Sequence, residues 1–277
     1  MFSMWFRILK FASKRNGWKQ LCFYLSNLDV WRFIEYSQAY EYINKTEKDS
    51  VIIDLGGGYT SLPSLFPINE YVVLDINRYA CAYQEKHGTK AIAADITKLP
   101  LATACADIVV AISSIEHLHD DHLAYKEIAR ILNERGVAVV SVPFSCTESK
   151  TIVMVRSSRQ ITILNKWRKF WKFLLGDMQL QYFLGQIATD SIEKYYCMTD
   201  LQKLLTGNGL CIVEYHLFGG KLLRGFFKIF NPGWFVLKDL LIGKLLYKLE
   251  NIIYRNNLNA AGIILKLKKN NQWTEPL

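Results

Sequence analysis

The strongest constraint on the fold is a series of five short apolar runs, rich in β-branched residues, which alternate with helical patterns. The runs are Val51–Leu55, Tyr71–Asp75, Ala91–Ala94, Asp107–Ile112 and Val137–Val142. They are nearly continuous in hydrophobicity, which is typical of strands buried on both faces of a parallel sheet. A helical pattern over His122–Asn133 separates the last two runs. Because strand–helix–strand units connect by right-handed crossovers, the sequence predicts an α/β fold with helices on both faces of the sheet.

Glycines and acidic residues stand where these runs end. Gly56, Gly57 and Gly58 follow the first run, and glycines there let the backbone turn sharply and approach a ligand closely. Asp75 ends the second run, about where nucleoside binders place an acid on ribose hydroxyls, and Asp95 follows the third. Ligands of open parallel sheets bind outside the carboxyl ends of the strands. The pattern therefore predicts one nucleoside-binding site.

The segments VIIDLGGGYT, YVVLDIN, AADITKLPL, ADIVVAISSIEHLHD and EIARILNERGVAVVSVPF together resemble class I S-adenosylmethionine-dependent methyltransferases, particularly the type 11 methyltransferase domain family. The resemblance implies a Rossmann-like fold with a mainly parallel seven-stranded sheet. Leu210–His216 would be the sixth strand. Ala261–Leu267 would be the seventh, antiparallel and inserted between the fifth and sixth. One departure is that Pro63 and Pro67 limit the first helix to about two turns, with Ser61 as its N-cap.

The resemblance also implies S-adenosylmethionine as cofactor and a set of residues that would bind it. The set is Asp54, Gly56, Gly57, Gly58, Asp75, Ile76, Asp95, Ile96, Ile112 and Ser113. By the same resemblance, Asp54 and the glycines would surround the methionine part of the cofactor. Asp75 would accept hydrogen bonds from the ribose, and Asp95 with Ile96 would contact the adenine. Ile112 and Ser113 would lie near the sulfonium.

Glu116 and His117 follow the fourth run, in the loop where related enzymes line the substrate pocket. His117 is the candidate catalytic residue, as a general base that is needed only if the methyl acceptor must lose a proton. The wider segment His117–His122 contains three histidines and two aspartates, but its spacing matches no zinc pattern. Carboxylates before a helix also suit the N-cap position. We therefore expect no metal ion.

The sequence divides into four parts around the predicted core. Residues 1–48 form a basic, aromatic helical extension, with a helix over residues 28–45, and residues 49–146 form the S-adenosylmethionine-binding core. Residues 147–195 are predicted to be a helical lid insertion that contains a basic amphipathic helix over residues 161–176. Residues 196–277 complete the fold, with a helix opened by Thr199 as N-cap and an amphipathic insertion at residues 218–259.

The net charge of +9 is unevenly distributed along the chain. Residues 1–20 carry five basic and no acidic residues, residues 21–149 carry 10 and 17, and residues 150–277 carry 19 and 8. Three interpretations of the basic amphipathic flanks stay open: a lid packed over the active site, docking to a membrane surface, or binding of nucleic acid. Nucleic acid is the least favoured, because no RNA-binding module pattern is present.

Six scattered cysteines without a CxxC pair predict free thiols in a reducing compartment. The first residues are apolar, but Arg7 and Lys10 interrupt them before a signal-peptide core could form. No stretch reaches the roughly 18 uncharged apolar residues of a membrane span. We therefore expect a cytoplasmic protein, with peripheral membrane contact if the flanks dock to lipid.

The function expected from these features is methyl transfer from S-adenosylmethionine to a small-molecule, lipid- or glycan-linked acceptor, at oxygen. One alternative is an NAD(P)-dependent oxidoreductase, because Gly56, Gly58 and Asp75 approximate the dinucleotide fingerprint. Ser61 stands where that fingerprint has Gly or Ala, and Asp95 has no role in it. A second alternative is a catalytically silent relative that serves as a scaffold at a membrane surface.

Overall fold

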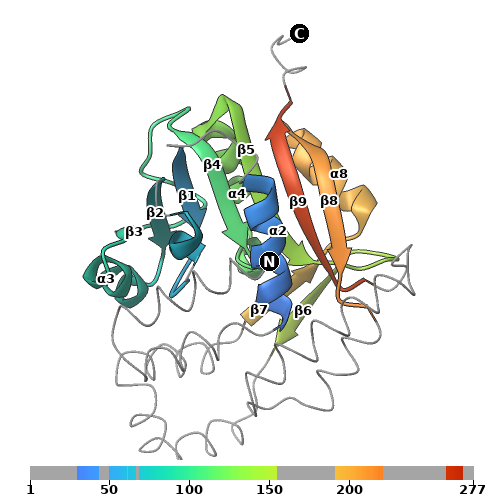
Figure 1. Ribbon diagram of the computed structural model, residues 1–277. Coiled ribbons are helices and arrows are strands. Elements are labelled where there is room, and N and C mark those ends of the chain that lie inside the picture. Colours follow the sequence, from blue (N-terminus) through green and yellow to red (C-terminus); the bar gives the residue numbers. More distant parts are fainter. Residues whose placement is uncertain are drawn as a thin grey trace, which may run out of the picture.

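The computed structural model describes residues 30–43, 50–60, 62–66, 69–154, 191–220 and 260–270. Its centre is a seven-stranded sheet of order β3-β2-β1-β4-β5-β9-β8 (Figure 1). The strands are β1 (Val51–Leu55), β2 (Glu70–Asp75), β3 (Lys90–Ala93), β4 (Ala106–Ile112), β5 (Leu132–Pro143), β8 (Leu210–Phe218) and β9 (Gly262–Lys269). β9 runs antiparallel between β5 and β8, and the other neighbouring pairs are parallel. This arrangement confirms the predicted Rossmann-like methyltransferase fold.

Two hydrophobic cores lie on opposite faces of the sheet, because the buried strands carry apolar side chains on both sides. Helices α4 (Asp121–Ile131) and α8 (Met198–Gly207) cover one face. Helix α2 (Val30–Ile43) and the 3₁₀ turn η1 (Leu62–Leu65) cover the other, and α2 crosses in front of the sheet in Figure 1. Helix α3 (Arg78–Lys86) packs beside β2 and β3. The result is a three-layer α/β molecule.

Several details differ from the sequence-based expectations. β3 is an edge strand whose residues are largely exposed, so its apolar run does not reflect burial on both faces. α4 ends at Ile131 and β5 begins at once, so Asn133 lies in the strand. Thr199 is not an N-cap, because α8 begins at Met198 after an extended Cys197. The helix expected after the glycines is only the single turn η1, which contains Pro63.

The segment predicted as a helical lid, residues 147–195, contains strands at both of its ends. β6 (Lys150–Met154) and β7 (Ser191–Tyr195) form an antiparallel pair, in register from Lys150–Tyr195 to Met154–Ser191. β7 contacts the 3₁₀ turn η2 (Ile115–His117) that follows β4, so this pair lies close to the carboxyl ends of the strands. The predicted amphipathic helix over residues 161–176 and nearly all of the predicted insertion at residues 218–259 lie outside the described residues.

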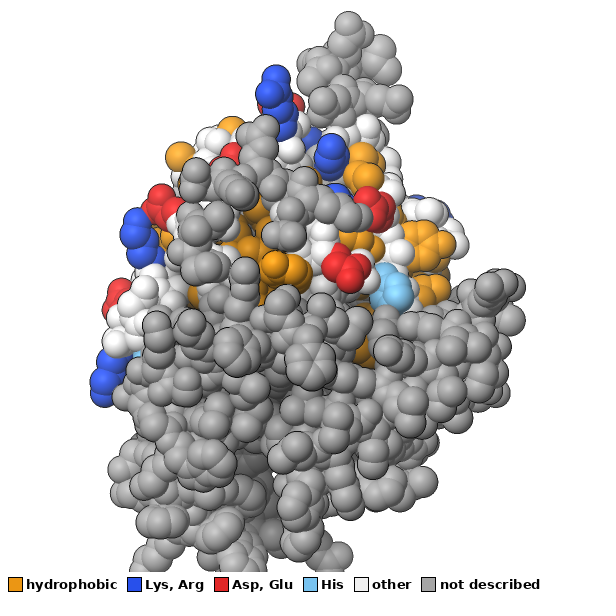
Figure 2. All heavy atoms as spheres, viewed as in Figure 1, with side chains coloured by type: hydrophobic (Ala, Val, Ile, Leu, Met, Phe, Trp, Pro, Cys, Tyr) orange, Lys and Arg blue, Asp and Glu red, His pale blue; other side chains and the backbone are white. Residues whose placement is uncertain are grey.

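On the face seen in Figure 2, the lysine and arginine side chains of the described residues are dispersed. They lie there at separate places, with acidic, hydrophobic and other side chains among them. Within the part of the chain that the structure describes, no helix is long and apolar enough to cross a membrane.

Candidate cofactor-binding site

A cavity of about 900 Å³ opens at the carboxyl ends of β1 to β4. The sheet order reverses here: β1 pairs with β2 on one side and with β4 on the other, and the two crossovers leave in opposite directions. Open α/β sheets bind ligands at such a switch point, because the loops after the two strands diverge and leave a crevice. The topology therefore places a binding site here before any side chain is considered.

The structure brings the predicted site residues together around this cavity. Its lining includes Asp54, Gly56, Gly57, Gly58, Asp75, Ile76, Asp95, Ile96, Ile112, Ser113 and His117, which are all the residues that the sequence singled out for cofactor binding and catalysis. They come from the ends of four neighbouring strands, since parallel strands present their carboxyl ends at one edge. What each residue binds stays a prediction.

The glycine loop is shaped so that side chains could not be accommodated. Gly56 has φ +70°, and a Cβ there would lie 2.5 Å from the Ser114 Cβ. A Cβ on Gly57 would lie 2.8 Å from Asp54 Oδ2 and 3.0 Å from Val73 Cγ1. Gly58 has φ +53°. Positive φ and these close contacts both require glycine, which leaves the backbone of this loop facing the cavity.

Asp75 connects the glycine loop to the end of β2. Its Oδ2 accepts a hydrogen bond from the Gly58 N–H at 2.8 Å, and its Oδ1 accepts one from the Asn77 N–H at 2.8 Å. Burial raises the pKa of this carboxyl, and the two backbone donors oppose the rise. Each carboxylate oxygen has two acceptor sites, so Asp75 can hold the loop and still accept a ligand hydroxyl.

Asp95 also lines the cavity, just after the end of β3. Its Oδ1 accepts hydrogen bonds from the Thr97 N–H at 2.8 Å and from the Thr97 hydroxyl at 2.7 Å. These contacts form a local turn that fixes the carboxylate just after β3. Ile76, with 76% of its surface exposed, and Tyr79, with 63%, line the same cavity. Exposed apolar side chains next to fixed carboxylates suit a flat ring that carries polar groups, because the ring can stack while its edge is bound.

Asp54 lies at the floor of the site, with 2% of its surface exposed. Its Oδ2 accepts a hydrogen bond from the Tyr71 hydroxyl at 2.7 Å. Burial raises the pKa of this carboxyl to about 7, because desolvation outweighs the stabilising hydrogen bond. The carboxyl group lies directly against the glycine loop at Gly57.

The turn after β4 brings His117 to the cavity and leaves Glu116 behind it. His117 Nδ1 lies 2.9 Å from the backbone oxygen of Ile192 in β7. Glu116, expected to line the substrate pocket, is 2% exposed and does not line the cavity. Its Oε1 lies 3.9 Å from His117 Nε2, and burial raises the pKa of its carboxyl to about 8.

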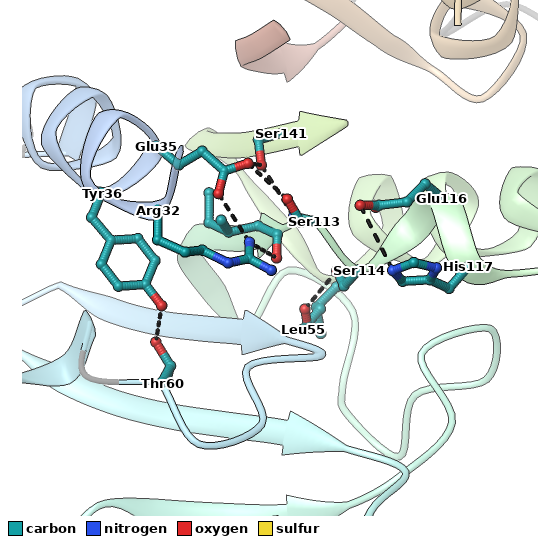
Figure 3. A network of polar contacts seen from close by, with 11 residues as sticks. Arg32, Glu35, Tyr36, Leu55, Thr60, Ser113, Ser114, Glu116, His117 and Ser141 are labelled. Carbon is teal, nitrogen blue, oxygen red and sulfur yellow. Dashed lines mark hydrogen bonds and ion pairs between the residues drawn. The ribbon is translucent and has the colours of Figure 1, made fainter. Parts of the chain in front are cut away.

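Sequence reasoning missed the contribution of α2 to this site. Arg32 and Tyr36 line the cavity, and the Tyr36 hydroxyl lies 3.0 Å from Thr60 Oγ1 (Figure 3). The sequence predicts this helix but carries no motif there, because its aromatic residues have the spacing of an ordinary core-facing helix. Asn77 was also missed; it is a polar residue two positions after the end of β2, which was the available signal.

The histidine- and aspartate-rich segment after β4 forms hydrogen bonds with β7 and with the residue that follows it. Asp121 accepts hydrogen bonds from Lys194 Nζ at 2.8 Å and from the Tyr196 hydroxyl at 2.7 Å. Among the described residues, no group of three His, Cys, Asp or Glu side chains is arranged to hold a metal ion. Asp121 therefore anchors β7 and the residue that follows it to the start of α4.

Comparison with known proteins assigns the segment that carries most of this site to a family. Residues 53–140 match the family model described as "Methyltransferase domain". Curated sequences from two strains of Mycobacterium tuberculosis, each named a "Probable S-adenosylmethionine-dependent methyltransferase", are 29% identical to this chain over 106 residues. That alignment covers 38% of this chain and 39% of the relatives, so the chain matches about two fifths of their length.

Solved structures share the fold at low sequence identity. The 1,6-didemethyltoxoflavin-N1-methyltransferase of Burkholderia thailandensis, solved with bound 1,6-didemethyltoxoflavin and S-adenosylhomocysteine, has a TM-score of 0.53 and 11% identity. The match covers 88% of this chain and 80% of that one. The [4+2]-cyclase SpnF has a TM-score of 0.51 and 12% identity, over 86% of this chain and 80% of that one. These matches show the fold, which hosts more than one chemistry.

Proposed function

Since residues 53–140 carry a class I methyltransferase domain of the type 11 family, we propose that this chain is an S-adenosylmethionine-dependent methyltransferase. The observation that supports the proposal best is the convergence of all ten predicted cofactor-binding residues on one cavity. Fixed carboxylates and exposed apolar side chains lie at its β2–β3 end, and the glycine loop and the turn after β4 lie at the other. The cavity thus offers different chemistry to the two ends of an elongated nucleoside.

The residues present fit S-adenosylmethionine part by part. Asp75 would accept from the ribose hydroxyls, and Asp95 with Ile96 would hold the adenine beside the exposed Ile76. The loop Gly56–Gly58 would lie against the amino-acid part, because its backbone is open to the cavity where side chains are excluded. When bound, the cofactor supplies a methyl group on a sulfonium, which is already activated for displacement. Alignment of the acceptor is therefore the main task left to the protein.

The acceptor is proposed to be a small-molecule, lipid- or glycan-linked oxygen nucleophile, and His117 its general base. The Ile192 oxygen can only accept a hydrogen bond, so the 2.9 Å contact assigns the proton of a neutral imidazole to Nδ1. Nε2 then carries the lone pair and can take the proton of the acceptor as its oxygen attacks the methyl group. Lipid or membrane contact rests on the flanking sequences alone, which lie mostly outside the described residues.

The oxidoreductase alternative fits the structure less well. A dinucleotide pyrophosphate is held at the N-terminus of a full helix after the glycine loop. In this chain the loop leads into η1, a single 3₁₀ turn of four residues. The scaffold alternative predicts that the cavity binds no nucleoside at all. A binding experiment therefore distinguishes both the oxidoreductase and the scaffold alternative from the proposal.

Calorimetric titration with S-adenosylhomocysteine, with NAD and NADP in parallel, tests the proposal. We expect binding of S-adenosylhomocysteine alone. Asp75→Asn should weaken it about tenfold or more, because the amide offers fewer acceptor sites and faces the Gly58 N–H with a donor in one orientation. Glu85→Gln on the exposed side of α3 is the matched control and should bind as the wild type does. Binding of NAD instead would support the oxidoreductase, and binding of none of the three would support the scaffold.

A further inference from the structure

Helix α2 lies outside the matched domain, yet one of its faces contacts three parts of the site. Arg32, Glu35 and Tyr36 are spaced i, i+3 and i+4, so they share one side of the helix. Figure 3 shows these three side chains pointing from α2 toward the ends of the strands. Tyr36 reaches the glycine-loop side through Thr60 at 3.0 Å, and Arg32 NH1 lies 3.5 Å from the backbone oxygen of Ile112.

Glu35 makes the most buried of these contacts. Its side chain is 1% exposed, and its Oε1 accepts hydrogen bonds from the hydroxyls of Ser113 at 2.7 Å and Ser141 at 2.8 Å. Its Oε2 accepts one from Arg32 NH1 at 2.9 Å. A buried carboxylate is costly unless it is paired and hydrogen-bonded, and Glu35 has donors on both oxygens. It therefore ties the ends of β4 and β5 to α2.

Ser113 adopts a conformation that a serine does not favour on its own. Its φ is +47°, in the left-handed region where a side chain is strained. Its N–H donates to the backbone oxygen and the hydroxyl of Ser141, both at 3.1 Å. With the bond from Ser113 Oγ to Glu35, the surroundings hold the residue in this state. Strain of this kind persists only where neighbouring contacts enforce it.

The conformation of Ser113 decides where Ser114 lies. The Ser114 hydroxyl donates to the Leu55 backbone oxygen at 3.0 Å, and its Cβ occupies the space that a Cβ on Gly56 would need. The turn after β4 therefore packs directly against the glycine loop after β1. A change in Ser113 would move Ser114 against Gly56 and alter the cavity between them.

We propose that Glu35 is a positioning residue for this pocket, which acts through Ser113 and Ser141 to hold the turn after β4 against the glycine loop. Ligand affinity then depends on a carboxylate contributed by a helix that precedes the methyltransferase domain. The inference rests on the proposed function only in the choice of S-adenosylhomocysteine as probe.

Glu35→Gln tests this role with little change of shape. Its amide presents one oxygen and one NH₂ group, so either the two serine hydroxyls or the Arg32 guanidinium faces a donor in place of an acceptor. We expect the folded variant to bind S-adenosylhomocysteine about tenfold more weakly than the wild type does, measured by calorimetry. Glu41→Gln, the same change at an exposed position of α2, is the matched control and should leave the affinity unchanged.

Ser113→Gly tests whether Glu35 acts through Ser113. Glycine adopts positive φ without strain, so a turn with Ser113→Gly no longer needs Glu35 to enforce it. We expect Glu35→Gln to weaken binding by less than about threefold in the Ser113→Gly background, compared with about tenfold in the wild type. Equal losses in both backgrounds would show that Glu35 does not act through Ser113, and that result would overturn the proposal.

Ser141→Ala covers the case in which Glu35→Gln does not fold. It removes one of the two hydroxyls on Glu35 Oε1 and one acceptor of the Ser113 N–H, and we expect a loss of about threefold in affinity. Unchanged affinity in folded Ser141→Ala would count against the proposal. Failure of the wild type to bind S-adenosylhomocysteine would instead contradict the proposed function, so the two outcomes are distinguishable.

Discussion

At the scale of single residues, the site depends on places where a side chain cannot fit. Gly56→Ala should lower the free energy of unfolding by about 2 kcal/mol, because alanine must adopt φ near +70° and its Cβ would overlap Ser114. Affinity for S-adenosylhomocysteine should fall with it, at least about tenfold. Urea unfolding and calorimetry on the same samples measure both effects.

Gly207→Ala provides the comparison for this substitution. Gly207 is the last residue of α8, and a Cβ there would meet no atom within 4 Å. Alanine in a helix stabilises the fold by up to about 1 kcal/mol relative to glycine, so we expect equal or slightly higher stability and unchanged binding. If Gly56→Ala and Gly207→Ala behaved alike, the steric account of the glycine loop would be wrong.

A second prediction for a single residue concerns the pH dependence of stability through Glu116. Burial raises the pKa of its carboxyl to about 8, and within the part of the chain that the structure describes its Oε2 has no hydrogen-bond partner. Below about pH 4.5 both folded and unfolded states hold the proton. Between that pH and 8 the unfolded state releases its proton while the folded state keeps it, so the free energy of unfolding falls as pH rises.

Glu116→Gln should remove this loss. Relative to the wild type, the variant should gain on the order of 4 kcal/mol in stability between pH 5 and pH 8.5, measured by urea unfolding at both pH values. Glu85→Gln, at an exposed position, should show no such gain. A variant whose stability followed the same pH dependence as the wild type would show that the Glu116 carboxyl does not keep its proton in the folded protein.

At the scale of elements, the apolar runs predicted β1, β2, β4 and the carboxyl-terminal half of β5 to within about two residues, because buried parallel strands leave a continuous hydrophobic signal. The run that became β3 gave the same signal but lies exposed at the sheet edge. β6 and β7 were missed altogether. Their pairing joins residues about 40 positions apart, and short-range periodicity carries no information on such contacts.

The contacts of α2 illustrate the same limit within the site. Its helical pattern was predictable, but the meeting of Glu35 with Ser113 and Ser141 spans 78 and 106 positions in the sequence. The strand-end residues were predictable because topology alone brings them to one edge. A side chain that arrives from another element can be found only once the elements have been packed together.

At the scale of the whole molecule, the fold and the cavity follow from one arrangement. β9 inserts between β5 and β8, and the two hydrophobic cores cover both faces of the sheet. A ligand can therefore approach the sheet at the carboxyl ends of its strands. The cavity there places carboxylates toward β2 and β3 and the strained turn with His117 toward β4. Resemblance to a family predicted the strand order; the sequence pattern alone did not.

The measurement that tests this account most directly is a crystal structure of the complex with S-adenosylhomocysteine. The account predicts a ligand that lies across the carboxyl ends of β1 to β4, with its ribose hydroxyls on Asp75, its adenine beside Ile76 and Asp95, and its sulfur near Ile112. A ligand bound in another place, or in this cavity with the adenine at the β4 end, would contradict it.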